Sequence, residues 1–226
     1  MIKQLLTLTL CLGFVHQIIS QESSPLSLTN GTYQIELDVD GRLDNDEVKD
    51  WPSFDGSSLG LIKFSQYPSK AEAKALVNLG VVILDYYPKG FYSVAIQKGA
   101  NLSALNTFGV EAHSPFKAEY KIDLDISTVP VRAISEDDKV FVNLLHFKHI
   151  DHQAFRAFLS SEDIEVVGSK ALYNYVTISV KPSEIKLAAE YAAVELISWV
   201  YELGEPENYT GRTAHRTNVI SHGNTY

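Results

Sequence analysis

The chain has 226 residues, of which 45% are hydrophobic and 21% are charged, and its formal net charge is −9. This is the composition of a globular protein rather than of a disordered chain. Lys and Arg form no cluster that could neutralise phosphates, which argues against a nucleic-acid-binding protein. The length allows one domain or two small ones.

Residues 1–20 have the layout of a secretory signal peptide. Lys3 precedes an apolar run over 5–15, and small or polar residues follow near Ser20. The run is shorter than the ~20 residues that span a membrane as a helix. A buried first element is the alternative. We expect a secreted, periplasmic or extracellular protein that has no membrane contact after signal cleavage. The only cysteine, Cys11, lies in this segment, so the mature chain is expected to form no disulfide.

Residues 21–58 are polar and are predicted to form an irregular segment with one strand over 32–39. Their stretch DVDGRLDND superficially resembles a calcium-binding loop. Counted from Asp38, however, Gly41 is the fourth residue, whereas such a loop needs glycine at the sixth. We interpret the stretch as a turn.

A regular pattern begins at Leu59, with a strand predicted over 59–66. Ser69 and Glu72 form a capping box that begins a helix, and Gly80 ends it. We expect the apolar face of this helix to hold Ala71, Ala75, Leu76 and Leu79.

Two apolar runs, 81–87 and 91–96, are joined by Pro88-Lys89-Gly90 and predict a β-hairpin. A short helix over 101–108 and a strand over 110–116 follow. Strand alternation places Phe91, Ser93 and Ala95 on one face of the second run and Tyr92, Val94 and Ile96 on the other.

The same order of elements is predicted again after a linker over 117–138. The second series is a strand over 139–147, a helix capped by Asp151, strands over 164–169 and 173–180, a helix over 183–192 and a strand over 194–202. The chain therefore contains an internal repeat of the order β-α-β-β-α-β.

This order is that of the ferredoxin-like, or split βαβ, unit. The predicted fold class is α+β, with two tandem ferredoxin-like units at 59–116 and 139–202, each an antiparallel sheet with both helices on one face. The other face of each sheet has no helix and must meet another unit or another protein. Residues 203–226 are polar, lack apolar periodicity and are predicted to be a junction tail.

Three histidines, His146, His149 and His152, recur at intervals of three. On one helix they would share a face and could hold a metal. The predicted elements place a bend between His146, at a strand end, and His152, in a first helical turn. We therefore favour solvated loop histidines over a zinc site.

No pattern of catalytic residues stands out. The sequence has neither a Gly-x-Ser-x-Gly nucleophile motif nor a phosphate-binding glycine loop. The acidic pairs Asp137-Asp138 and Glu162-Asp163 are interpreted as solvated turns. We expect no catalytic constellation, cofactor or metal within these residues.

The stretch LDYYPKGFYSV at 84–94, preceded by a strand and a helix, resembles the amino-terminal pro-region of secreted bacterial subtilisin-like serine proteases. The second repeat, ending in VELISWVYE, resembles the propeptide unit that precedes their catalytic domain. The tail stretch GRTAHRTNVI resembles the junction before that domain.

The resemblance implies a temporary inhibitor and folding template. Its partner is the subtilisin-like catalytic domain in cis, which contacts the open sheet face while the tail blocks the substrate cleft as an added strand. The cleft-binding and processing region then comprises Glu205, Pro206, Glu207, Asn208 and Tyr209. The Asp, His and Ser of that catalytic domain do not occur in the chain in the family's motifs, so we expect either a fragment of a serine endopeptidase or an inhibitor encoded alone. A secreted, non-enzymatic binding or adhesion module is the alternative.

Overall fold

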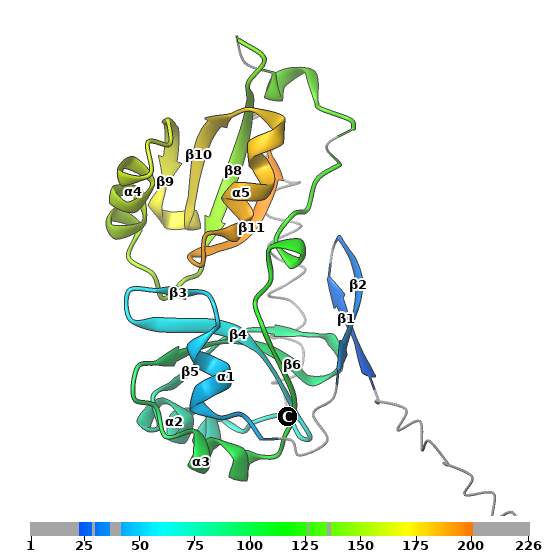
Figure 1. The fold of residues 1–226 in the computed structure, drawn as a ribbon, viewed down its shortest axis with the longest axis vertical. Coiled ribbons are helices and arrows are strands. Elements are labelled where there is room, and N and C mark those ends of the chain that lie inside the picture. Colours follow the sequence, from blue (N-terminus) through cyan, green and yellow to red (C-terminus); the bar gives the residue numbers. More distant parts are fainter. Residues whose placement is uncertain (1–22, 29, 37–41, 126, 135–136, 201–226) are drawn as a thin grey trace, which may run out of the picture.

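The computed structural model describes residues 23–28, 30–36, 42–125, 127–134 and 137–200 (Figure 1). These residues form a mixed α+β fold with a five-stranded and a four-stranded antiparallel sheet, a two-stranded hairpin and five α-helices. The predicted signal peptide at 1–20 and tail at 203–226 lie outside the described residues.

The first sheet is built by residues 53–115. Its main strand order is β7-β4-β6-β5, and the short β3 pairs with the beginning of β4. Every pairing is antiparallel. The strands are β3 (Ser53–Phe54), β4 (Ser57–Phe64), β5 (Val81–Tyr87), β6 (Phe91–Gln97) and β7 (Val110–Pro115).

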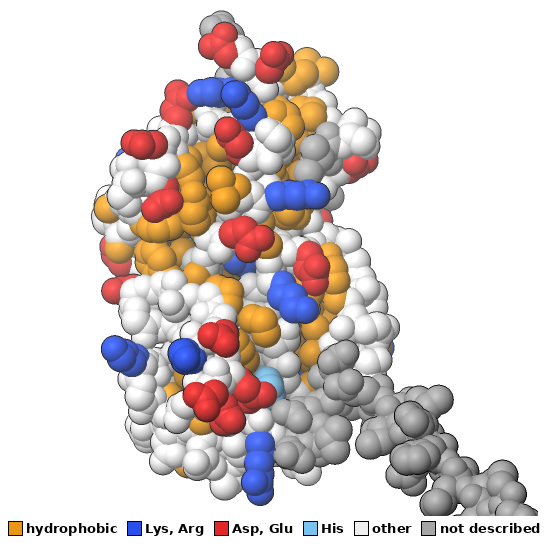
Figure 2. Space-filling model, viewed as in Figure 1, with side chains coloured by type: hydrophobic (Ala, Val, Ile, Leu, Met, Phe, Trp, Pro, Cys, Tyr) orange, Lys and Arg blue, Asp and Glu red, His pale blue; other side chains and the backbone are white. Residues whose placement is uncertain are grey.

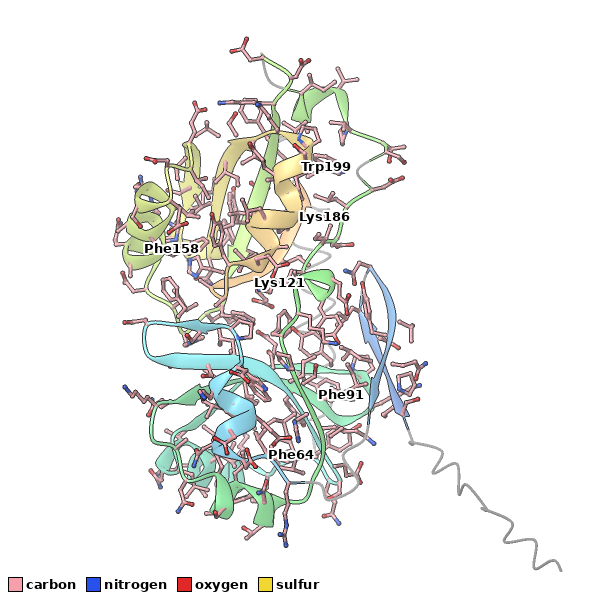
Figure 3. All side chains as sticks on the ribbon, in the orientation of Figure 1. Phe64, Phe91, Lys121, Phe158, Lys186 and Trp199 are labelled. Atoms are coloured by element: carbon pink, nitrogen blue, oxygen red, sulfur yellow. The ribbon has the colours of Figure 1, made fainter. Side chains whose placement is uncertain are left out.

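The predicted hairpin at 81–96 is confirmed: a short 3₁₀ turn over Pro88–Gly90 joins β5 to β6. The predicted faces of β6 are confirmed as well, because Phe91 and Ala95 belong to one hydrophobic cluster and Val94 and Ile96 to another. Figure 3 labels Phe91 and, on β4, Phe64, which belong to these two different clusters and so lie on opposite faces of the sheet.

Two helices that follow strands of the first sheet, α2 (Lys70–Asn78) and α3 (Leu102–Leu105), cover the face that carries Phe64. The predicted capping box of α2 is confirmed, because Glu72 N donates to Ser69 Oγ and Ser69 N donates to the Glu72 carboxylate. Ala71, expected on the apolar face, is exposed. The fully buried side chain of α2 is Leu76, because its second half rather than its first turn reaches the sheet.

The second sheet repeats this arrangement with the strand order β11-β8-β10-β9. If the four main strands of each sheet are numbered in chain order, both sheets have the spatial order fourth, first, third, second. Its elements are β8 (Val140–His146), α4 (His152–Ser161), β9 (Val166–Lys170), β10 (Tyr175–Val180), α5 (Ile185–Glu190) and β11 (Val194–Trp199). Asp151 caps α4 by accepting from Ala154 N, as predicted.

The segment 21–58 is more regular than predicted. Strand β1 (Ser23–Leu28) pairs antiparallel with β2 (Gly31–Glu36), and α1 (Asn45–Lys49) precedes β3. Helix α1 was not predicted, and the strand predicted over 32–39 is confirmed in part by β2. Its partner was missed because Pro25 interrupts the apolar pattern of β1, although Asn30-Gly31 is a hairpin turn signal.

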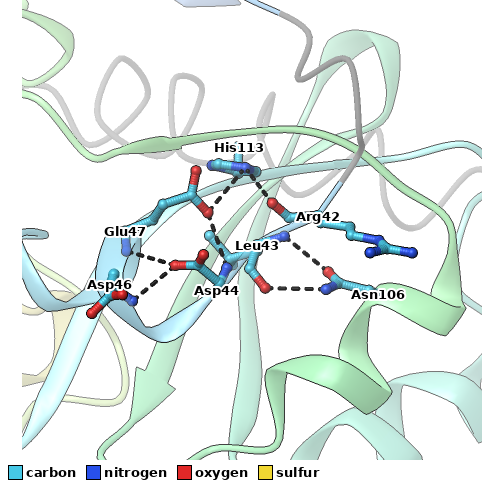
Figure 4. Close-up of polar contacts among 7 residues, drawn as sticks. All are labelled: Arg42, Leu43, Asp44, Asp46, Glu47, Asn106 and His113. Carbon is cyan, nitrogen blue, oxygen red and sulfur yellow. Dashed lines mark hydrogen bonds and ion pairs between the residues drawn. The ribbon is translucent and has the colours of Figure 1, made fainter.

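Helix α1 begins with a capping box, and the residue before it is held by Asn106 of the 3₁₀ turn that follows α3 (Figure 4). Asp46 N and Glu47 N donate to the Asp44 carboxylate, and Asp44 N donates to Glu47. The Asn106 side chain both accepts from Leu43 N and donates to Leu43 O. The acidic residues of the described part of the DVDGRLDND stretch thus cap a helix.

The helix-free face of the first sheet is covered by the chain itself. One hydrophobic cluster joins Leu59, Leu61 and Phe91 of that face to Leu26 and Ile35 of the β1–β2 hairpin. The same cluster includes Phe116, which follows β7, Tyr120 of the linker and Phe147 of the β8–α4 loop, and it continues into the second sheet. Lys148 Nζ, in that loop, forms an ion pair of 2.8 Å with Asp85 of the first sheet. The two sheets and the hairpin therefore share one core.

Candidate functional site

The second sheet has one face that carries neither of its helices. The side chains of α4 and α5 join those of Val142, Leu144, Val176 and Ile178 in the shared core. Strand alternation turns the intervening residues to the other side. We call this other side the docking face; it consists of Phe141, Asn143, Leu145, Tyr175, Thr177, Ser179, Leu196 and Ser198.

The register of the strands brings these residues together. Tyr175 is the cross-strand partner of Leu145, and Leu145 also pairs with Leu196 on its other side. Thr177 pairs with Asn143, and its hydroxyl donates to Asn143 Oδ1 at 2.7 Å. The face thus alternates part-exposed apolar side chains with small polar ones, a mixed chemistry typical of protein-docking surfaces.

The docking face continues into the turn between β9 and β10. Leu172 is 85% exposed and Tyr173 is 58% exposed, although both are large hydrophobic side chains. The Tyr173 ring lies nearly parallel to that of Tyr175, with centroids 6.5 Å apart. Asn174 takes the left-handed conformation that closes the turn. An exposed apolar tip beside a helix-free sheet face is a feature of interaction surfaces.

The predicted histidine group is partly brought together. His146 ends β8 and His152 begins α4, as expected, but His146 is buried rather than solvated. Its Nε2 lies 3.0 Å from His152 Nδ1, and its Nδ1 lies 3.0 Å from Phe147 O. The bend between strand and helix, which we expected to separate the two rings, folds them against each other. His149 is exposed.

Desolvation lowers the pKa of all three histidines. Arg156 also lowers the pKa of His152, and Asp151 opposes this shift. For His149, His146 adds to the lowering and Asp55 opposes it. For His146, Phe147 O and Asp151 oppose the lowering, and His152 adds to it.

We therefore expect acid to destabilise the protein through this group. Because the folded state disfavours the charged rings, the unfolded chain binds more protons once the pH falls below about 6.5. The contribution of these histidines to stability is therefore fully present above that pH and declines below it. His152→Gln removes one of these titrations, so urea unfolding at pH 7.5 and pH 5.5 should differ less in the variant than in the parent chain. An unchanged difference would contradict this explanation.

The other predicted residues fall into two groups. Glu205, Pro206, Glu207, Asn208 and Tyr209 lie outside the described residues. Asp137-Asp138 and Glu162-Asp163 are exposed, and Asp137, Asp138 and Asp163 have positive φ, as in tight turns. Among the described residues, no three His, Cys, Asp or Glu side chains converge as a metal site would require. None of the described helices is long and apolar enough to cross a membrane.

Comparison with known proteins adds one finding. A family model described as a domain of unknown function (DUF8729) matches residues 27–117. The matched segment contains β2, α1 and the whole first sheet, and it ends before the second sheet. No curated protein and no solved structure matches the chain. The docking face therefore lies outside the matched segment.

Proposed function

We propose that each large sheet with the two helices between its strands is a ferredoxin-like unit, and that the two units are a duplication. Three observations support this. The strand orders are the same, the helices follow the same strands, and both sheets have register shifts between first and fourth and between second and third strands. Register shifts between the same pairs of strands in two sheets are consistent with repeated architecture.

We further propose that the chain is the pro-region of a secreted subtilisin-like serine protease and acts as its folding template and temporary inhibitor. The observation that carries this proposal is the contrast between the two helix-free faces. The hairpin and linker cover that of the first sheet, whereas the apolar residues Phe141, Leu145 and Leu196 of the second lie outside the shared core. The second unit is thus the one whose helix-free face is joined to no hydrophobic cluster of the described residues, and in this proposal that face meets the catalytic domain.

In this proposal the signal peptide directs secretion, and the docking face packs on surface helices of the protease. The segment after β11 leads from the edge of the sheet towards the substrate cleft, where residues 205–209 bind as an added strand. The first unit, which shares its core with the second, holds the second sheet rigid and lowers the entropy lost on docking.

Inhibition of a secreted subtilisin by residues 21–226 tests the proposal. Leu145→Glu places a charge in the middle of the docking face and should raise the inhibition constant at least about tenfold, since burying an unpaired charge costs well over 1.4 kcal/mol. Leu187→Glu is the matched control, because Leu187 is 60% exposed on α5, on the opposite side of the sheet.

Deletion of 203–226 should weaken inhibition strongly, because it removes the cleft-binding segment. Equal inhibition by the parent chain and the tail deletion would count against a role for the tail in the cleft. Equal inhibition by the Leu145 and Leu187 variants would instead count against the docking face.

A further inference from the structure

A hollow of about 350 Å³ lies on the first unit, where α1 faces the β3–β4 turn and the end of β6. It is separate from the docking face, since all its residues belong to segments 45–58 and 96–102. Its lining consists of Asn45, Val48, Lys49, Ser53, Gly56, Ser58, Ile96, Gln97, Lys98, Gly99, Ala100 and Leu102.

The hollow has an apolar floor. Val48 of α1, Ile96 of β6 and Leu102 of α3 are buried side chains of the core on the helix side of the first sheet. Two turns keep the space above this floor open. Gly56 and Gly99 have φ of 77° and 85°, and a Cβ added at either position would meet no atom within 4 Å. The positive φ favours glycine at both positions, and glycine leaves no side chain at these two points of the wall.

The lining carries charge of one sign only. Lys49 and Lys98 are the charged residues of the wall, which includes no Asp or Glu. Both lysines are exposed, and neither pairs with a carboxylate in the described part of the chain. Although the net charge of the chain is −9, a concave surface whose lining carries only ammonium charges attracts anions locally.

We infer that this hollow binds a small monocarboxylate with a short aliphatic tail. The tail would lie on Val48, Ile96 and Leu102, and the carboxylate would meet the ammonium groups of Lys49 and Lys98 in charge-assisted hydrogen bonds. A few polar groups around an apolar floor, in a volume of this order, are the usual design of a small-molecule site. A free short-chain acid and the carboxyl-terminal leucine of a peptide carry the same chemistry.

Chemical-shift titration of residues 21–226 tests this inference, with hexanoate and neutral hexanamide as probes. Hexanoate should shift the amides of Gly56 and Gly99 and saturate with a Kd of about 1 mM, corresponding to a weak single-site ligand. Hexanamide should bind at least about tenfold more weakly, because it lacks the charge. Acetyl-Ala-Leu as the acid and as the amide forms the second arm: tighter binding of that acid than of hexanoate identifies a peptide terminus, and weaker binding identifies a free acid.

Variants give the decisive comparison. Lys98→Met and Lys49→Met should each weaken hexanoate binding about threefold to tenfold, whereas Lys74→Met, at an exposed position of α2 away from the hollow, should not. A thermal melt confirms that each variant is folded. Equal affinity for hexanamide, unchanged binding by the Lys49/Lys98 double variant, or no shift of Gly56 and Gly99 at 20 mM, well above the expected Kd, overturns the inference.

Discussion

Gly60→Ala is expected to destabilise the protein by about 3 kcal/mol, the upper part of the range for overpacking a core. Gly60 lies within β4, where a Cβ would overlap the Trp51 ring and lie 2.7 Å from Ser114 O. Trp51 is buried, and Ser114 O belongs to the neighbouring strand β7. Neither can move without opening the helix-side core or the β4–β7 ladder. Urea denaturation of both proteins measures the difference.

Gly168→Ala is the matched control. Gly168 lies in β9, with negative φ, and its added Cβ would be 3.6 Å from Thr177, an ordinary contact. We expect a change within about 0.5 kcal/mol, as for most surface substitutions. If both alanine variants lose the same stability, the cause is a general effect of adding a methyl group to a strand and not the contact between Trp51 and β4.

Lys121→Met is expected to stabilise the protein near neutral pH, and this advantage should disappear in alkali. Lys121 is 1% exposed and donates to Tyr191 O at 2.9 Å. It lies where the linker meets α5 (Figure 3). Burial lowers its pKa from 10.5 to about 8, and Glu190 opposes part of this shift. Keeping this ammonium charged in the folded state therefore costs free energy.

The sign follows from the two pKa values. Below pH 8 the lysine is charged in both states, so the folded state is destabilised by the full free energy of burying the charge. Above pH 10.5 the lysine is neutral in both states, and this destabilisation is gone. The stability of the methionine variant relative to the parent chain should therefore fall by about 3 kcal/mol between these two pH values. Urea unfolding at pH 7.5 and 10.5 measures it. Lys186→Met, at an exposed position of α5, controls for the loss of one positive charge; a relative stability of Lys121→Met that does not change with pH contradicts the account.

Figure 2 shows apolar side chains over the helices of the second unit, near its junction with the first. Phe158 of α4 contacts Phe54 of β3 and Tyr191 edge to face, with centroids 5.4 and 5.0 Å apart. These rings pack at the interface between the two units. With the Lys148–Asp85 ion pair, they connect the first sheet to the second sheet and its helices.

Local signals were sufficient to predict two of the elements that have them. The hairpin at 81–96 follows from the two apolar runs around Pro88-Lys89-Gly90, and α2 follows from the Ser69–Glu72 box. The prediction missed α1, although Asp44 and Glu47 carry the same kind of box, because the acidic stretch was read as a turn. In each of these cases the decisive interaction lies within a few residues of the chain.

Contacts between distant segments could not be predicted in this way. Asn30 Nδ2 donates to the carbonyls of Glu119 and Ile122, about ninety residues away, and this holds the hairpin on the linker. As a result the helix-free face of the first sheet is covered by the chain itself, in agreement with the expectation that it must meet another unit or another protein. Alternation along β8 and β10 does identify the docking face from sequence, but only the tertiary fold shows that, among the described residues, the hairpin and the linker pack on the first sheet and not on this face.

Hydroxyl-radical footprinting of residues 21–226, alone and mixed with a secreted subtilisin whose active-site serine is replaced, tests the proposed docking face most directly. Oxidation reports the solvent exposure of individual aromatic rings. We predict that Phe141, Tyr173 and Tyr175 become protected in the complex, while Tyr67 of the first unit, 66% exposed, reacts as before. Protection of Tyr67 without protection of Tyr175, or no protection at any of these rings, would contradict the assignment of the second sheet as the surface that binds the protease.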